Sequence, residues 1–402
     1  MSIDELAPFG RGERGSLSGR TILQIIPRLD AGGAERTTID VAAALARAGA
    51  RALVASEGGR LVSELQAVGG VLAPFPAATK NPFSMALNAR RLARLVVSER
   101  VDLVHARSRA PAWVALGACR IVKRPLVTTY HGAYSGRSSL KLLYNSVMAR
   151  GDAVIANSEY TAEIIARLYP DARPRLRVIH RGTDFSKFAP EMVDSGRVAR
   201  LREAWGVASH DRIVLLAARL TGWKGHKTLI EAARLLKAGG VTDVRFVFAG
   251  DAQGRDSYVR EIDALIEKSG LAGVVRRVGH CDDMPAAFLA ASVVAVPSTE
   301  PEAFGRTAVE AQAMGALVVV SDLGAVPETV LAPPQTPAEA RTGWRVPPGD
   351  AEALAKALQS ALSLGASGRD AMIKRARAHV ESKFSLEHML RETLDVYRQA
   401  LA

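Results

Sequence analysis

Short apolar runs alternate with longer amphipathic stretches along the first half of the chain. An apolar run without a polar face is typical of a strand buried on both sides of a parallel sheet, whereas helical periodicity marks the stretches between such strands. We predict helices over residues 37–48 and 84–99. The predicted strands lie near residues 21–26, 52–55, 70–75, 102–105, 125–129, 152–156 and 177–179. The pattern therefore predicts a doubly wound α/β domain.

The second half of the chain repeats this alternation. The predicted strands lie at 213–217, 244–248, 293–296 and 316–320, and the predicted helices at 226–237, 256–269, 306–314, 350–364 and within 368–402. The fold class that follows is α/β, with two tandem Rossmann-like doubly wound domains. Such an arrangement predicts a cleft at the carboxyl ends of both sheets.

Domain boundaries follow from changes in composition. Residues 1–19, rich in Gly, Arg and Ser, are expected to form a flexible tail, and 20–185 an N-terminal domain. Residues 182–200 have the polar composition of a linker, and 186–379 form the predicted C-terminal domain. The last helix, about 380–402, is expected to pack back onto the N-terminal domain.

Length and composition describe a globular chain of two domains, with 402 residues and 48% hydrophobic content. No apolar stretch reaches the roughly 18–20 residues of a transmembrane helix, and the first residues lack the apolar core of a secretory signal. Cys119 and Cys281 lie far apart without metal-ligand spacing. These features favour a reduced, cytoplasmic setting.

Positive charge is concentrated in one region. The chain has a net charge of +12, and residues 80–150 contain 13 Lys or Arg but only two acids, Glu99 and Asp102. Such a region attracts nucleic acid, anionic lipid or an acidic substrate, unless it is simply a solvated helix face. Residues 87–97 set apolar residues beside arginines, as helices at a membrane surface do.

The segment 301–310 is the most informative candidate site. It follows the predicted strand 293–296 and opens a helix, and a helix start offers free backbone N–H groups to a phosphate. Glu302 and Glu310 flank this start; because carboxylates repel phosphate, they fit the hydroxyl groups of a sugar-bearing ligand. Glu5 and Glu13 have the same separation, so the spacing has meaning only in its strand–loop–helix context.

Two cations follow the predicted strand 213–217. Arg219 and Lys224 lie in the loop before a helix, where guanidinium and ammonium groups can hold phosphate oxygens and neutralise a departing diphosphate. Gly250 ends the next strand and allows close backbone approach to a ligand, or simply forms a turn. The segment around Asp283 is a further candidate for framing a nucleobase.

The N-terminal half offers a glycine pair and a histidine. Gly32 and Gly33 join the first strand to the first helix and would permit close approach to a phosphate or sugar. The loop lacks the spacing G-x-G-x-x-G, and no P-loop lysine follows, which disfavours nicotinamide and ATP. His131 ends a strand, where it either faces the cleft or is structural.

Taken in order, these pieces resemble the retaining GT-B glycosyltransferases of family 4 over about residues 20–400. The resemblance implies a nucleotide-sugar donor in the cleft, UDP- or GDP-linked, with neither metal nor cofactor. It implies that Arg219 and Lys224 bind the diphosphate, that Glu302 holds sugar hydroxyls and that Glu310 holds the ribose. Further donor contacts implied are those of Gly32, Gly33, Gly250, Asp283, Ala303, Phe304, Gly305, Arg306 and Thr307, with His131 beside the transferred sugar. The chain departs from the family pattern at 181–183, where Arg-Gly-Thr replaces the frequent Asn-Gly-Val.

The function expected is sugar transfer to a lipid-linked or lipopolysaccharide-type cell-envelope acceptor at the inner face of the cytoplasmic membrane. The basic region favours an anionic membrane surface as a partner. One alternative is a sugar-nucleotide epimerase on the same fold. Another is a nucleic-acid-binding protein, although the chain lacks an aromatic stacking ladder or a known recognition motif. The sequence leaves the donor sugar, its base, the acceptor and the oligomeric state open.

Overall fold

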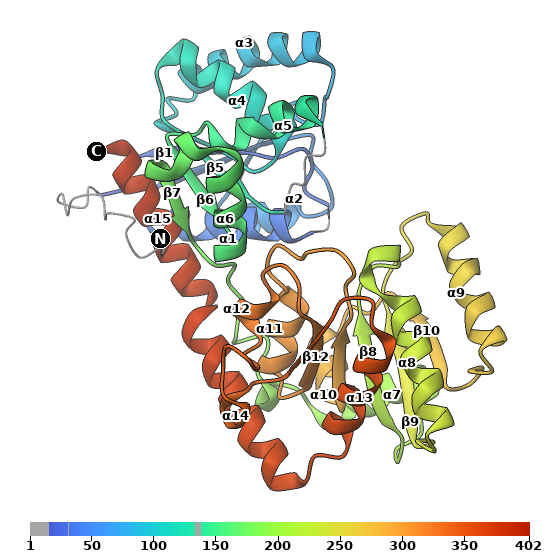
Figure 1. The fold of residues 1–402 in the computed structure, drawn as a ribbon. Helices are drawn as coiled ribbons and strands as arrows, with labels where there is room; N and C mark the ends of the chain where they lie inside the picture. Colours follow the sequence, from blue (N-terminus) through green and yellow to red (C-terminus); the bar gives the residue numbers. More distant parts are fainter. Residues whose placement is uncertain (1–15, 31, 133–137) are drawn as a thin grey trace. The chain divides into compact units, whose positions relative to one another are not determined.

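The computed structural model describes residues 16–30, 32–132 and 138–402, and it divides into two compact units (Figure 1). Unit 1 comprises residues 1–180 and 387–402, and unit 2 comprises residues 181–386. Most of the tail predicted over 1–19 lies outside the described residues. Its last residues already belong to the fold, since Leu17 is buried and Gly19 donates its N–H to the carbonyl of Gly49.

Unit 1 is built on a seven-stranded parallel sheet in the order β3-β2-β1-β4-β5-β6-β7. Its strands are β1 (Thr21–Ile25), β2 (Arg51–Ser56), β3 (Val71–Pro74), β4 (Leu103–Ala106), β5 (Leu126–Tyr130), β6 (Ala153–Ala156) and β7 (Leu176–Val178). Its helices are α1 (Gly33–Arg47), α2 (Val62–Ala67), α3 (Pro82–Ser98), α4 (Arg109–Val122), α5 (Ser139–Ser146), α6 (Glu159–Leu168) and the C-terminal α15 (Leu386–Leu401). The first-half strands predicted from apolar runs are all present. The central ones, such as β1 and β4, are buried along their whole length, as expected of strands covered on both faces.

Unit 2 is built on a six-stranded parallel sheet in the order β10-β9-β8-β11-β12-β13. Its strands are β8 (Arg212–Ala217), β9 (Val244–Ala249), β10 (Val275–Gly279), β11 (Val293–Val296), β12 (Leu317–Ser321) and β13 (Trp344–Val346). Its helices are α7 (Ser195–Ala204), α8 (His226–Ala238), α9 (Asp256–Lys268), α10 (Met284–Ala290), α11 (Arg306–Ala313), α12 (Val326–Thr329), α13 (Ala351–Leu362) and α14 (Ala366–Lys383). The predicted α/β class with two doubly wound domains is confirmed.

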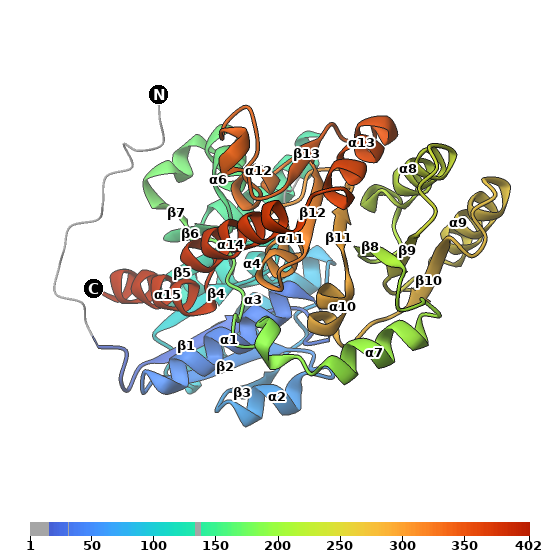
Figure 2. The same cartoon turned by 90° about the horizontal axis from the view of Figure 1, so that it is seen from below.

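Helices cover both faces of the unit 2 sheet. On one face, α13 packs beside α8 over a core that includes Leu229, Phe246 and Leu358 (Figure 2). On the other face, α7, α10 and α11 cover a second apolar cluster. The prediction of a linker over 182–200 is therefore wrong in its last part, because residues from Ser195 onward form α7, which packs on α10.

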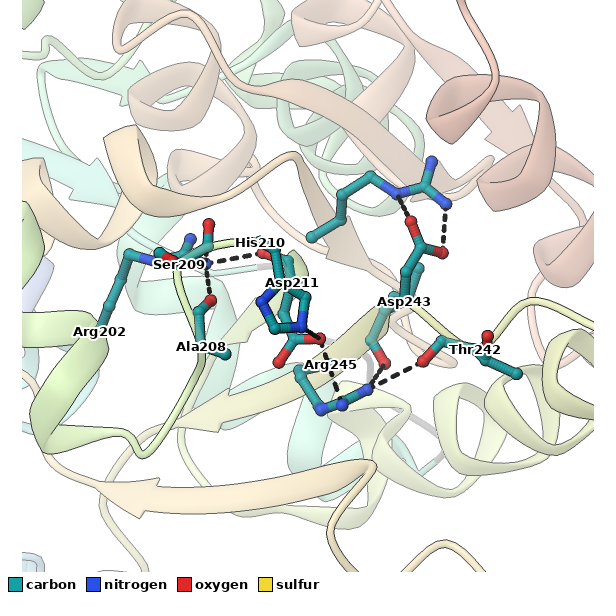
Figure 3. A network of polar contacts seen from close by, with 10 residues as sticks. Arg202, Ala208, Ser209, His210, Asp211, Thr242, Asp243 and Arg245 are labelled. Carbon is teal, nitrogen blue, oxygen red and sulfur yellow. Dashed lines mark hydrogen bonds and ion pairs between the residues drawn. The ribbon is translucent and has the colours of Figure 1, made fainter.

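Ion pairs and hydrogen bonds hold the amino ends of β8 and β9 (Figure 3). Asp211, nearly buried, pairs with Arg245, and Arg212 binds Asp243 through two hydrogen bonds of 2.8 and 2.6 Å. Arg202 of α7 donates to the carbonyl of Asp211 at 2.7 Å. Because these charges lie at the amino ends of the strands, away from the edge where doubly wound folds bind ligands, they are structural.

The C-terminal helical segment breaks at Phe384 and Ser385. There the backbone N–H of Thr183 donates to the carbonyl of Phe384, and that of Leu386 donates to the carbonyl of Thr183. The Phe384 ring packs edge-on against Phe304 at 5.3 Å between centroids. The break ties the two ends of unit 2 together and supports the loop before α11.

Each sheet has one position where the strand order reverses direction. In unit 1 it lies between β1 and β4, and in unit 2 between β8 and β11. Doubly wound folds bind ligands outside the carboxyl ends of the strands at this switch point, where the two following loops diverge.

Candidate functional site

The loops that follow β8 and β11 lie against each other at the switch point of unit 2. The backbone N–H of Thr299 donates to the carbonyl of Trp223 at 2.8 Å, and Thr307 Oγ1 donates to the carbonyl of Ala217 at 3.4 Å. The first loop carries Arg219 and Lys224, and the second carries Glu302. Residues far apart in the sequence are thus brought to one edge of the sheet.

Lys224 and Glu302 form an ion pair. Lys224 Nζ donates to Glu302 Oε1 at 2.8 Å, and the two side chains are only 14% and 12% exposed. Ser298 Oγ donates to the same oxygen at 2.6 Å. Within the described part of the chain, both bonds to this carboxylate fall on Oε1, which leaves Oε2 able to accept a ligand hydroxyl.

The ring of Trp223 also contacts the lysine. Lys224 Nζ lies 4.1 Å from the centroid of the Trp223 ring, a cation–π contact. The ring and the carboxylate together hold the ammonium group at the carboxyl edge of the sheet. The sequence prediction missed both Trp223 and Ser298; the signal was their place in the two loops, one residue before Lys224 and four before Glu302.

The start of α11 presents backbone donors at the same edge. Gly305 precedes the helix with φ 89°, a left-handed conformation that favours glycine, and no side chain caps this end. Phe304 is buried against Phe384, so the loop can offer its backbone rather than its side chain. The uncapped N–H groups and the helix dipole suit an anionic group.

Glu310 lies one turn inside α11 and is buried. Arg306 Nε donates to its Oε1 at 2.5 Å. Burial raises the pKa of the Glu310 carboxyl, while the positive charges of Arg306 and Arg181 act in the opposite direction. The effect of burial is the larger, so the pKa of Glu310 stays above the usual value of a glutamate.

Arg219 differs from Lys224 in being exposed. It follows β8, and among the described residues it takes part in no ion pair. A guanidinium in this position can turn toward a diphosphate without breaking an existing bond.

Gly250 and Asp283 have structural explanations in unit 2. A Cβ atom at Gly250 would lie 1.8 Å from the carbonyl oxygen of Ala218, so the close approach of the β8 and β9 ends requires glycine. Asp283 caps α10 by accepting from the N–H of Ala286, and its carboxylate binds Arg197 at 2.9 and 2.6 Å. The hydrogen bond from Arg197 lowers the pKa of Asp283. The nucleobase role of this segment stays a prediction.

The three candidates from the N-terminal half lie at the carboxyl edge of the unit 1 sheet. Gly32 precedes α1 and Gly33 is its first residue, directly after the loop from β1. His131 follows β5 and is half-buried. Their role toward a donor held by unit 2 stays a prediction.

A buried polar network in unit 1 escaped the sequence analysis. His105 Nδ1 lies 2.5 Å from the hydroxyl of Tyr397 on α15, and its Nε2 lies 2.7 Å from Thr129 Oγ1. Arg107, directly after β4, donates to Gln24 Oε1 on β1 at 2.6 Å. Burial holds the pKa of His105 well below its usual value and raises that of Tyr397 to about 12, so both groups are neutral at pH 7.

Most apolar residues of the pattern over 87–97 lie on the buried face of helix α3 and not on its surface. Leu92, Ala93 and Val96 are buried in the unit 1 core against α4, which accounts for the apolar stripe. Leu87 and Val97 remain exposed. Among the described residues, no helix is both long enough and apolar enough to cross a membrane.

Two family profiles match the chain. The Glycosyltransferase Family 4 profile matches residues 31–187, and that of Glycosyl transferases group 1 matches residues 198–379. A glycosyltransferase of known structure from Rickettsia africae is 34% identical, with a TM-score of 0.86 over 95% of this chain and 98% of its own. The chain therefore belongs to family 4 of the glycosyltransferases and has the GT-B fold.

Two further relatives are informative. HepE from Anabaena, solved in complex with UDP-glucose, is 27% identical, with a TM-score of 0.79 over 93% of this chain and 99% of its own. The D-inositol 3-phosphate glycosyltransferase of Xylanimonas cellulosilytica is 33% identical over 264 residues, which is 63% of this chain. That match spans 58% of the length of the curated relative.

Proposed function

We propose that this protein transfers a sugar from a UDP-sugar to a lipid-linked cell-envelope acceptor at an anionic membrane face, with retention of anomeric configuration. The observation that carries the donor part is the Lys224–Glu302 pair beside the uncapped start of α11, at the switch point of unit 2. It combines cations for a diphosphate with a carboxylate for hydroxyl groups. The UDP-glucose complex of HepE supports UDP as the nucleotide of the sugar donor.

Each residue then has a distinct task. Arg219 and Lys224 bind the diphosphate together with the backbone N–H groups at the start of α11. Glu302 accepts hydrogen bonds from sugar hydroxyls through Oε2, and Glu310 accepts from the ribose. Lys224 and Glu302 also neutralise each other, so neither charge is left unpaired in a largely buried position.

In the proposed reaction, the bond between the anomeric carbon and the diphosphate oxygen breaks while the acceptor oxygen approaches from the same face. The acceptor hydroxyl gives its proton to a departing phosphate oxygen as the new glycosidic bond forms. Lys224 and Arg219 stabilise the negative charge that develops on the leaving diphosphate. This mechanism assigns the charge stabilisation to side chains, and we expect activity to persist in EDTA.

The donor part is tested by thermal unfolding with UDP-, GDP- and ADP-sugars. A ligand at about 100 times its dissociation constant stabilises the folded protein by about 2.7 kcal/mol. We expect a clear rise in Tm with a UDP-sugar and a much smaller one with the others. Equal, negligible shifts with all three nucleotides would refute a nucleotide-sugar site.

The acceptor part rests on the basic region and on the exposed apolar residues of unit 1. A second candidate acceptor, a small phosphorylated polyol, is favoured by the curated relatives named D-inositol 3-phosphate glycosyltransferases. Radiolabelled sugar from the UDP donor should enter the organic phase with a lipid-linked acceptor. Transfer to inositol phosphate alone, with label only in the aqueous phase, would replace the lipid proposal by the polyol one. Donor turnover without any acceptor would instead favour an epimerase.

A further inference from the structure

Unit 1 contains an apolar groove formed by α3, α4 and α5. Its cavity volume is about 900 Å³. This volume lies in the range of roughly 300–1,000 Å³ of sites that enclose small molecules. Trp113, Gly117 and Ile121 line it from one face of α4, and Leu140 and Tyr144 line it from α5.

Large apolar side chains at the groove face solvent. Phe83 on α3 is 88% exposed, and Leu140 on α5 is 80% exposed. Leu87, Ile121 and Leu143 are also exposed and line the same groove. Clustered exposed apolar residues with a polar rim mark an interaction site rather than an ordinary surface.

The groove is positively charged. Lys80, Arg90 and Arg150 line it, and none of its described lining residues is acidic. The Arg150 guanidinium lies 5.2 Å from the centroid of the Trp113 ring. An apolar channel with half-buried Trp and Tyr rings and a purely cationic rim is complementary to an anionic headgroup joined to a hydrocarbon chain.

We propose that this groove binds the hydrocarbon chain of an anionic lipid in a bilayer, with the lipid phosphate held by Lys80, Arg90 and Arg150. The proposal rests on the membrane acceptor in the proposed function and names the surface that meets the membrane. It also gives the basic region a location, because three of its cations surround one apolar channel.

The first experiment locates the lipid with the full-length protein and vesicles. Phosphatidylcholine vesicles containing phosphatidylglycerol should carry the protein in flotation, and vesicles of phosphatidylcholine alone should not. Lipids brominated along the acyl chain should quench the fluorescence of Trp113, the only tryptophan in unit 1. Trp113→Phe should remove the quenchable component, whereas free inorganic phosphate should leave the fluorescence unchanged.

Variants then distinguish the contact with the hydrocarbon chain of the lipid from the contact with its headgroup. The double variant Phe83→Asp/Leu140→Asp should reduce vesicle binding by about tenfold or more, while Phe83→Leu should retain it. Val97→Asp is the matched control, because Val97 is 65% exposed on the same helix but does not line the groove. Lys80→Gln and Arg90→Gln should each weaken binding to anionic vesicles by about fivefold.

Arg47, an exposed cation at the end of α1, provides the control for charge. Arg47→Gln should change vesicle binding little. Flotation that survives Phe83→Asp/Leu140→Asp, without quenching of Trp113, would overturn the proposal by placing the membrane contact elsewhere. A wild-type dimer in light scattering that dissociates in this double variant would overturn it by making the groove a self-interface.

The outcomes also separate this inference from the proposed function. If the protein binds a UDP-sugar but no vesicle, the groove proposal fails and the donor site stands. If vesicles bind through the groove but no nucleotide-sugar binds, the proposed transfer fails and the lipid groove stands.

Discussion

Units 1 and 2 place their strands in the same order around the switch point, but the residues at that point differ in charge and burial. In unit 2 the loops carry an ion pair, Lys224 with Glu302, next to an exposed Arg219. In unit 1 the switch point lies between β1 and β4, and His105 on β4 and Arg107 after it are buried. His105 bonds to Tyr397, and Arg107 bonds to Gln24 on β1. The same topology therefore carries charged loops in unit 2 and a buried polar network in unit 1.

The two units share a topology and differ in their loops, which is where folds of this kind carry their sites. In unit 2, the loops at the carboxyl edge carry the paired Lys224 and Glu302 and the exposed Arg219. In unit 1, the polar groups under the switch point bond to one another, and the unusual surface is the apolar groove of α3, α4 and α5. We infer that unit 2 supplies the donor chemistry and that unit 1 supplies the contact with the acceptor environment.

The largest expected effect is the loss of turnover when Glu302 is replaced. Glu302→Gln keeps the shape of the side chain but removes a charged acceptor, whose hydrogen bond contributes about 1.5–3 kcal/mol. We expect kcat to fall by about 10- to 150-fold. The Tm should also fall, because the largely buried Lys224 loses its charged partner. Steady-state kinetics at saturating donor measure it, and wild-type turnover would remove Glu302 from the site. Glu300→Gln, at an exposed position two residues away, is the matched control.

The buried network of unit 1 gives the next effect. Tyr397→Phe removes the hydroxyl bonded to His105 and leaves a buried polar group unsatisfied, which costs about 1–3 kcal/mol. The free energy of unfolding, measured with urea, should fall by about 2 kcal/mol. Tyr169→Phe, at a half-buried hydroxyl bonded to the carbonyl of Leu142, should cost less. UDP binding should not change in either variant, and a loss of affinity in Tyr397→Phe would show that the network is coupled to the donor site.

Acid should destabilise unit 2 through His226. Burial against Phe248 and Tyr258 lowers the pKa of His226 to about 4. The unfolded chain binds a proton below about pH 6.5 while the folded chain does not, so this contribution to stability is present above pH 6.5 and is lost as the pH falls toward 4. Between pH 7 and pH 5 the loss is about 2 kcal/mol.

His226→Leu should reduce the difference in the free energy of unfolding between pH 7 and pH 5. The exposed His210 provides the control, since His210→Leu should leave that difference as in the wild type. Identical pH dependence in wild type and His226→Leu would show that other groups cause the acid sensitivity.

The sequence predicted the seven strands of the unit 1 sheet and the four interior strands of the unit 2 sheet, most of which are apolar runs. It missed β10, an edge strand interrupted by Arg276 and Arg277, and β13, which has only three residues. It also missed α7, which has no fully buried side chain and hence little apolar periodicity. Elements with a weak hydrophobic pattern are defined by tertiary packing instead.

The sequence predicted which loops form the site but not which of their residues bond to one another. Strand–loop–helix context indicated Lys224 and Glu302 separately, but their pairing depends on β8 and β11 being neighbours in the sheet. The bond between His105 and Tyr397 joins residues 292 positions apart, and no local pattern indicates it. Such contacts follow from the strand order, which the hydrophobic pattern does not encode.

The smallest expected effects are those of replacing Lys224 and Arg219, the two cations in the loop after β8. Lys224→Met should weaken UDP binding about tenfold in calorimetry, because the proposed charge-assisted contact to the diphosphate is lost from a side chain that is only 14% exposed. Arg219→Met should weaken it by about fivefold, since an exposed guanidinium is better screened by solvent. Lys227→Met is the control, because Lys227 follows in the same segment but pairs with Glu261 on α9. If Lys227→Met weakened UDP binding as much as Lys224→Met, the general positive charge of the segment, rather than the site at the β8–β11 switch point, would account for nucleotide binding.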